Sequence, residues 1–203
     1  MRILAFVSLL LTQSFAPLNA AEKEKPKTSP AILTFYVTGI ECASCVEMVR
    51  QSVSDTPGVM DLFVEQRIDS YASVAFDPQQ VSAHQIAQAI FDSIPLHGRP
   101  YEPRLMLTIP DYAKPEIAAK VDSVIARHAA FIEVETMDKA KGELLLYFLP
   151  LKNDPTNNKP QGWNHLTLLH ALQDPAPKGL GLKVQVLSEG LDMLNLPTKT
   201  PSQ

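Results

Sequence analysis

The fold of this chain is decided by residues 31–59, AILTFYVTGIECASCVEMVRQSVSDTPGV. Apolar and polar side chains alternate from Ile32 to Val37, and this period of two predicts a half-buried strand. A loop with a glycine and two cysteines follows. After the second cysteine the apolar residues recur at helical spacing until Pro57-Gly58 ends the pattern, at Val46, Val49 and Val53. The stretch therefore predicts a strand, a cysteine loop and a helix.

The pattern continues through a complete small unit. Residues 59–64 and 71–76 read as two strands, and Ser82 followed by Gln85 is a capping box for a second helix. A short strand within residues 96–104 would close the unit. The order strand, helix, strand, strand, helix, strand is that of a ferredoxin-like (βαββαβ) sandwich.

The same order then repeats without cysteines. The expected elements of this second unit are a strand 104–109, a helix 115–127, strands 131–136 and 143–149, a helix 163–172 and a strand 182–187. We therefore expect an α+β chain of two tandem ferredoxin-like sandwiches, the second degenerate and lacking the CxxC. The expected domains are 31–102 and 103–190, followed by a tail at 191–203. An alternative stays open, in which 104–109 is the last strand of the first unit.

The first twenty residues have the features of a secretory signal peptide. Arg2 precedes an apolar run, and Leu18-Asn19-Ala20 offers a small residue at the cleavage site. Residues 21–30 are rich in lysine, glutamate and proline and read as a flexible leader. The sequence thus predicts a periplasmic or secreted protein that is soluble after the signal is removed.

Composition excludes several classes of protein. The chain has 203 residues, a net charge of −4 and a mean hydropathy of −0.02. A multispanning membrane protein is excluded, and without a basic surplus we expect no nucleic-acid partner. Two cysteines are too few for a disulfide-rich scaffold.

The two cysteines form the motif Cys42-Ala43-Ser44-Cys45, with one thiol in a loop and the other in the first turn of a helix. The positive end of the helix dipole lowers thiol pKa values, and thiolates are ligands for soft metal ions such as Cu(I), Zn(II) and Hg(II). The same features suit redox chemistry. The motif alone leaves both readings open.

The surrounding residues resemble the heavy-metal-associated (HMA) domain family over about residues 31–95. The matching segments are TGIECASCV at 38–46, PGV at 57–59 and VAFDP at 74–78. This family includes copper chaperones, N-terminal domains of metal-pumping ATPases and the periplasmic mercury-binding protein. The resemblance implies a non-enzymatic protein whose Cys42 and Cys45 bind one soft metal ion. It also implies transfer of that ion to a metal transporter or metalloprotein acceptor.

The chain departs from the family pattern at three places. Ile40 replaces the usual methionine beneath the loop, a tolerable exchange of apolar side chains. Glu41 stands where threonine is common and resembles the pattern of zinc, cadmium and lead pumps, which makes its carboxylate a candidate third ligand and favours Zn(II)-like ions. Ser93-Ile94-Pro95 replaces the family's Gly-Tyr, Gly-Phe or lysine.

Two other functions compete with metal carriage. A thiol-disulfide oxidoreductase would be expected to have an aromatic residue before the first cysteine, where this chain has Glu41. A pure interaction module would use the cysteine loop as a recognition surface. Among the histidines, the spacing of His84 and His97 predicts solvent exposure and no link to the cysteines, and His165 and His170 diverge on their helix. Trp163 is expected in the core.

Overall fold

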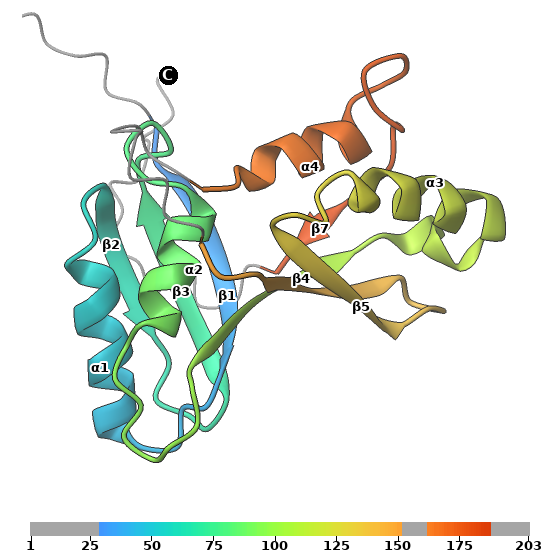
Figure 1. Cartoon of the computed structure of the whole chain (residues 1–203). Helices are drawn as coiled ribbons and strands as arrows, with labels where there is room; N and C mark the ends of the chain where they lie inside the picture. The colour runs from blue at the N-terminus through green and yellow to red at the C-terminus, as the bar shows by residue number, and fades with distance from the viewer. Residues whose placement is uncertain (1–28, 152–161, 188–203) are drawn as a thin grey trace, which may run out of the picture.

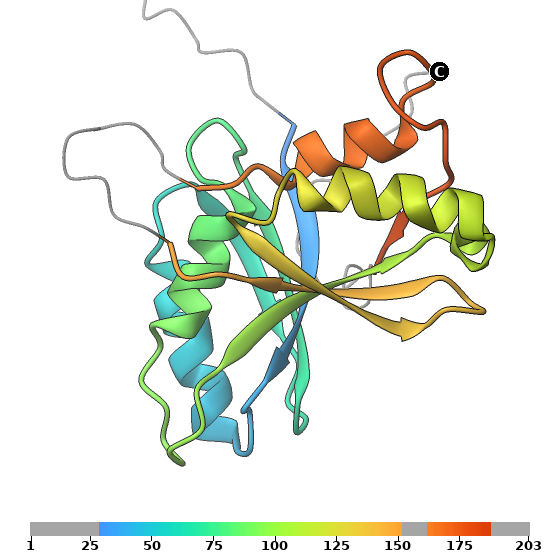
Figure 2. The same ribbon diagram turned by 45° about the vertical axis from the view of Figure 1, so that its right-hand side comes forward.

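The computed structural model describes residues 29–151 and 162–187, and Figures 1 and 2 show their arrangement. The predicted signal peptide and tail, and nearly all of the predicted leader, lie outside these residues. None of the described helices has both the length and the apolar composition that a membrane span requires. In chain order the elements are β1 (Ala31–Thr38), α1 (Ala43–Ser54), β2 (Val59–Val64), β3 (Ser70–Phe76), α2 (Ala83–Phe91), β4 (Glu102–Thr108), the 3-10 helix η1 (Pro110–Ala113), α3 (Pro115–Ala126), β5 (Ile132–Asp138), β6 (Glu143–Phe148), α4 (His165–Gln173) and β7 (Gln185–Val186).

The described strands form one antiparallel sheet in the order β2-β3-β1-β4-β6-β5, with β7 also paired to β4. Two ferredoxin-like patterns are present in this order. The first unit is β2-β3-β1-β4 and the second is β5-β6-β4-β7, so the predicted α+β class with a repeated βαββαβ order is confirmed.

Strand β4 belongs to both units. Its first residues pair with the end of β1, in the register Thr38↔Glu102 and Tyr36↔Arg104. Its opposite edge pairs with β6, and its last two residues also pair with β7. The expectation of a short strand before a separate strand 104–109 is therefore wrong. The alternative, in which 104–109 is the last strand of the first unit, agrees with the pairing of β4 (Glu102–Thr108) with β1, and the same strand is also the first of the second unit. Figure 2 shows β4 running from the first unit into the second. The expected boundary at 102/103 falls at the start of this shared strand.

Alternation along β4 gives the two units a common core. Its buried residues all face one side of the sheet, and they are Pro103, Leu105 and Leu107. Helix α2 packs against the first of them and α4 against the other two. Because both helices lie on the same face, the buried apolar side chains of the two units form one continuous cluster.

Local signals set most element ends correctly. The predicted capping box at Ser82 is present, with the Gln85 amide donating to Ser82 Oγ and the Ser82 amide donating to Gln85 Oε1. The last helix begins two residues later than predicted, because Asn164 caps it by accepting a hydrogen bond from the Leu166 amide. The predicted strand at 182–187 shrinks to the two residues of β7.

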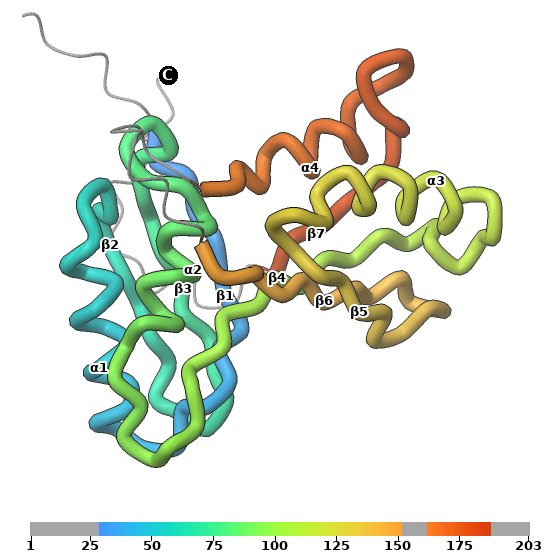
Figure 3. Tube along the Cα trace, in the orientation of Figure 1, coloured from blue at the N-terminus to red at the C-terminus, as the bar shows by residue number. Residues whose placement is uncertain are grey.

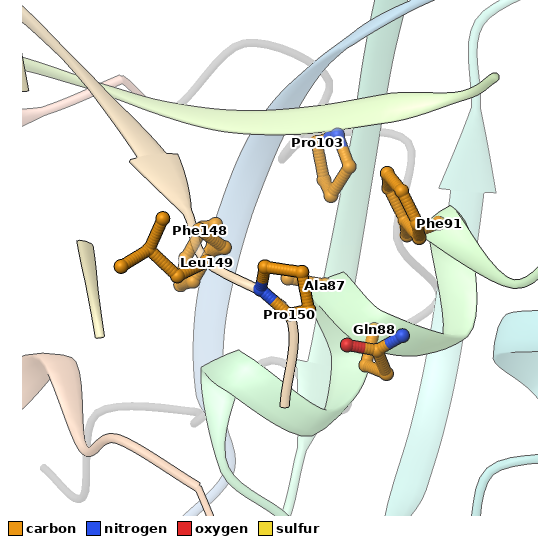
Figure 4. Close-up of a pocket in the computed structure, with 7 residues that line it drawn as sticks. All are labelled: Ala87, Gln88, Phe91, Pro103, Phe148, Leu149 and Pro150. Atoms are coloured by element: carbon orange, nitrogen blue, oxygen red, sulfur yellow. The ribbon is translucent and has the colours of Figure 1, made fainter. Parts of the chain in front are cut away.

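Helix α2 also holds the end of β6 through side chains. His84 Nε2 donates to the carbonyl of Leu149 at 2.6 Å, and the Leu151 amide donates to Gln88 Oε1 at 2.7 Å. A small hollow of about 20 Å³ lies where α2 meets β4 and the end of β6, a junction that we call the seam. Phe91, Pro103 and Phe148 are among the residues that line it (Figure 4). His84 is thus buried, and the prediction of an exposed His84 is wrong because the second unit covers it.

Trp163 lies in the core as predicted, held by two histidines. Its backbone amide donates to His84 Nδ1 at 3.2 Å, and its indole Nε1 donates to His128 Nδ1 at 3.0 Å. Because the Nδ1 atoms of both imidazoles accept these hydrogen bonds, neither Nδ1 carries a proton, and both rings are neutral. Nearby His165 packs against Phe76, and its buried Nδ1 has no hydrogen-bond partner in the described part of the chain.

We expect the free energy of unfolding of the protein to decrease in acid because of His165. Burial lowers the pKa of His165 from 6.5 to about 4. Between these values the unfolded chain binds more protons than the folded one, so the stabilisation is complete above about pH 6.5 and disappears toward pH 4. Between pH 7 and pH 5 His165 alone should cost about 2 kcal/mol of unfolding free energy.

The check is urea unfolding at the two pH values, followed by the fluorescence of the single tryptophan, Trp163. The loss between pH 7 and pH 5 should be about 2 kcal/mol smaller in His165→Leu than in the parent. Burial also lowers the pKa of His84 and of His128, so part of the loss should remain. His170→Leu, a change at an exposed histidine on the same helix, should show the same loss as the parent. An equal loss of stability in the parent and in His165→Leu would contradict the assignment.

Candidate metal centre

Three loops meet at the end of the first unit that lies away from α3 and α4. They are the cysteine loop between β1 and α1, the loop between β2 and β3, and the loop between α2 and β4 (Figures 1 and 3). The pairing of Thr38 with Glu102 brings the first and the last of these together, because the chain leaves β1 where it enters β4. Side chains from separate parts of the sequence can therefore share one site here.

The cysteine loop is held by its backbone. Gly39 has φ +89°, and a Cβ there would lie 2.3 Å from the carbonyl oxygen of Pro100, so this position requires glycine. The Gly39 amide donates to Asp69 Oδ1 at 2.7 Å, and the Asp69 amide donates to the Ile40 carbonyl at 3.0 Å. Ile40 is buried, 1% exposed, beneath the loop as the sequence predicts.

The two thiols stand at the N-terminus of α1. Cys42 is the N-cap residue, and its sulfur accepts a hydrogen bond from the Cys45 amide at 3.1 Å. Cys45 is buried, whereas Cys42 is partly exposed, and both are free cysteines. The two Sγ atoms are 2.6 Å apart. A tetrahedral Zn(II) with Zn–S bonds of ~2.3 Å needs about 3.8 Å between them, so the two sulfurs would have to move apart to bind it.

The two thiols differ in acidity. Burial opposes ionisation of Cys45, but the Cys42 thiol, the Glu41 backbone amide and the nearby Tyr101 hydroxyl outweigh it and lower the pKa of Cys45. The hydrogen bond to Cys45 raises the pKa of Cys42. The pair therefore ionises first at the buried sulfur, with the Cys42 thiol as its donor. A thiolate at Cys45 is ready to bind a metal ion.

His97 is a candidate for a third ligand. Its imidazole and the two sulfurs offer ligand atoms that all lie within 4.8 Å of one another, a grouping that can hold a metal ion. The prediction that His97 stands apart from the cysteines is wrong, although its predicted exposure is confirmed. Sequence spacing hides this contact, because the loop before β4 folds back to the end of β1. The proximity of His97 to the cysteines could have been predicted from the expected strand order, since that order places these two loops side by side.

Glu41 occupies a different position. Its Oε1 accepts a hydrogen bond from Arg99 Nη1 at 3.2 Å, in an ion pair at the surface. Its carboxylate is not part of the group formed by His97 and the two sulfurs. The role of Glu41 as a third ligand stays a prediction.

Tyr101 lies beside Cys45, next to the cysteine loop. It is fully buried at the start of β4, and its hydroxyl has no hydrogen bond of ordinary geometry in the described residues. Burial and the nearby Cys45 raise the pKa of Tyr101 to about 12, so the phenol keeps its proton. A protonated hydroxyl beside Cys45 favours the thiolate over the thiol.

Three exposed apolar side chains lie on the loops that meet at the candidate site. Ile68, Ile94 and Leu96 are 70%, 71% and 44% exposed, and they come from the two loops that flank the cysteine loop. A shallow hollow of about 170 Å³ lies beside Cys42, and both charged and apolar side chains line it, among them Glu41, Arg67 and Ile68. An exposed apolar rim of this kind is typical of a contact surface.

Comparisons with known proteins give a likeness among solved structures only. No protein-family model and no curated protein sequence matches the chain. Among solved structures, the N-terminal soluble domains of Bacillus subtilis CopA align over 80% of this chain and 97% of that one. Their identity is 16% and the TM-score is 0.33. The fold is therefore assigned from the strand order described above.

We expect Tyr101→Phe to change the chemistry of Cys45 without unfolding the protein. The phenylalanine ring fills the same space, and loss of an unpartnered buried hydroxyl should leave the unfolding free energy unchanged or higher by about 1 kcal/mol. The pKa of Cys45 should rise. In the reduced, metal-free protein, the pH at which the Cys45 thiolate forms, followed by its ultraviolet absorbance, should therefore be higher in Tyr101→Phe than in the parent. Tyr112→Phe, at a second buried tyrosine in the other unit, is the control. An unchanged titration in Tyr101→Phe would remove the hydroxyl from this role.

Proposed function

We propose that this protein is an exported, non-enzymatic carrier of one soft metal ion. The observation that carries the proposal is the convergence of Cys42, Cys45 and His97 from two loops at one exposed end of the fold. The predicted signal peptide supports a periplasmic or secreted location.

The donor set defines the class of ion. Two thiolates and one imidazole suit Cu(I), Zn(II) and Hg(II), whereas hard ions such as Mg²⁺ and Ca²⁺ prefer oxygen ligands. Three protein ligands leave a tetrahedral Zn(II) one open position. That open position favours exchange with an incoming ligand over permanent structural binding.

Transfer to a partner fits the exposure of the site. Cys42 and His97 are accessible, whereas Cys45 is covered. An acceptor's ligand can therefore approach from the side of Cys42 and His97 while Cys45 still holds the ion. The apolar rim of Ile68, Ile94 and Leu96 would rest against the acceptor, a metal transporter or metalloprotein.

The competing function is thiol-disulfide exchange. It is favoured by the contact between the two sulfurs and by the lowered pKa of Cys45. An anaerobic titration separates the two functions. The reduced protein without its signal peptide is titrated with Cu(I), Zn(II) and Hg(II) after its free thiols are counted, and insulin reduction is measured in parallel. One tightly bound equivalent without reductase activity supports the carrier. No binding despite two free thiols would overturn it.

The three ligands should contribute unequally. Cys42→Ser with Cys45→Ser should abolish tight binding of every soft ion. His97→Ala should weaken Zn(II) by about 10- to 100-fold and Cu(I) much less, because two thiolates alone satisfy a linear Cu(I) site.

The matched control for this series is His170→Ala, which removes an exposed histidine from α4 and should leave both affinities unchanged. Competition with a chromophoric chelator measures each dissociation constant. Equal weakening of Zn(II) and Cu(I) by His97→Ala would contradict the ligand role of this side chain.

A further inference from the structure

The loop that carries His97 is anchored at both ends. We define the histidine loop as Ile94–Pro100. Before it, Ser93 is buried and its hydroxyl donates to the Ala89 carbonyl at 3.0 Å. After it, Tyr101 is fully buried, and the Pro100 carbonyl lies against Gly39. The residues between these anchors are exposed, so the anchors alone do not fix the direction of the His97 side chain.

An ion pair joins the histidine loop, near its C-terminal end, to the cysteine loop. Arg99 Nη1 donates to Glu41 Oε1 at 3.2 Å, directly beside the first cysteine. Gly98 stands between His97 and Arg99 with φ +77°, a conformation that glycine adopts without strain. The turn lets two residues with one glycine between them both reach the cysteine loop.

We infer that the Arg99–Glu41 ion pair positions His97 as the third ligand, so that Glu41 acts through Arg99 and not on the metal ion. The inference rests on the proposed function and deepens it. A carboxylate engaged by a guanidinium has a partner already, and the ligand atoms of His97, Cys42 and Cys45 gather without it.

The two roles of Glu41 predict opposite responses to a change at Arg99. If Arg99 positions His97, removal of the Arg99 side chain frees the histidine loop. Binding of an ion that is coordinated by the imidazole should then weaken. If Glu41 is a ligand, removal of Arg99 releases the carboxylate and strengthens binding. Exposed ion pairs contribute little, so the first case gives a change of about 2- to 5-fold.

The experiment is a double-mutant cycle on the Zn(II) dissociation constant of the reduced protein without its signal peptide. The variants are Arg99→Gln, His97→Ala and their combination. Arg99→Gln should weaken Zn(II) binding about 2- to 5-fold when His97 is present and have no effect in the His97→Ala background. Cu(I) affinity should respond less. The control is Arg50→Gln. It removes one positive charge, as Arg99→Gln does, and an exposed ion pair with Glu47, and it should leave Zn(II) affinity unchanged.

Charge reversal completes the test. Glu41→Arg and Arg99→Glu should each weaken Zn(II) binding, and the two together should restore it to within about 2-fold of the parent. Tighter binding or no change in Arg99→Gln, or the same loss in the His97→Ala background, would overturn the positioning role. A parent protein that binds no Zn(II) would overturn the proposed function instead, so the two failures are distinguishable.

Discussion

The antiparallel pairing of β1 with β4 is the constraint on which the rest of the structure depends. It occupies three residue pairs at the end of β1, from Tyr36↔Arg104 to Thr38↔Glu102. The cysteine loop leaves β1 at this point, and the histidine loop enters β4 at the same point. One short ladder therefore sets the distance between the candidate ligands. The same ladder leaves the other edge of β4 free for β6, which begins the second unit's sheet.

The thiols acquire different properties because they occupy different positions on one helix end. Cys42 is the N-cap and remains accessible, whereas Cys45 lies in the first turn and is buried against Tyr101. Burial alone would make Cys45 a poor thiolate. The local donors reverse that effect, so the buried sulfur is the better ligand and the exposed one is the better point of exchange. A carrier needs both properties, since it must hold an ion and release it to another protein.

The sequence predicted the local parts of this fold well because the signals were local. Alternation from Ile32 to Val37, the capping box at Ser82 and the helical spacing after Cys45 depend on neighbours within one element. The sharing of β4 was harder to predict, since pairing of both edges of a strand leaves no mark in its own alternation. His97 and His84 were misjudged for a related reason. Each is placed by a loop or unit distant in sequence, the first beside the cysteines and the second beneath Leu149.

The second unit is connected to the candidate metal centre through the strand that it shares. Leu105 and Leu107 pack beneath α4, and the amino-terminal half of the same strand begins beside Tyr101 and the histidine loop. A shift of β4 would therefore move the floor of the site as well as the core of the second unit. The contacts of His84 and Gln88 with the end of β6 oppose such a shift, because they join α2 directly to the second unit. The cysteine-free repeat can thus support the proposed metal site without contributing a ligand. It does so by holding in register the strand that follows the histidine loop.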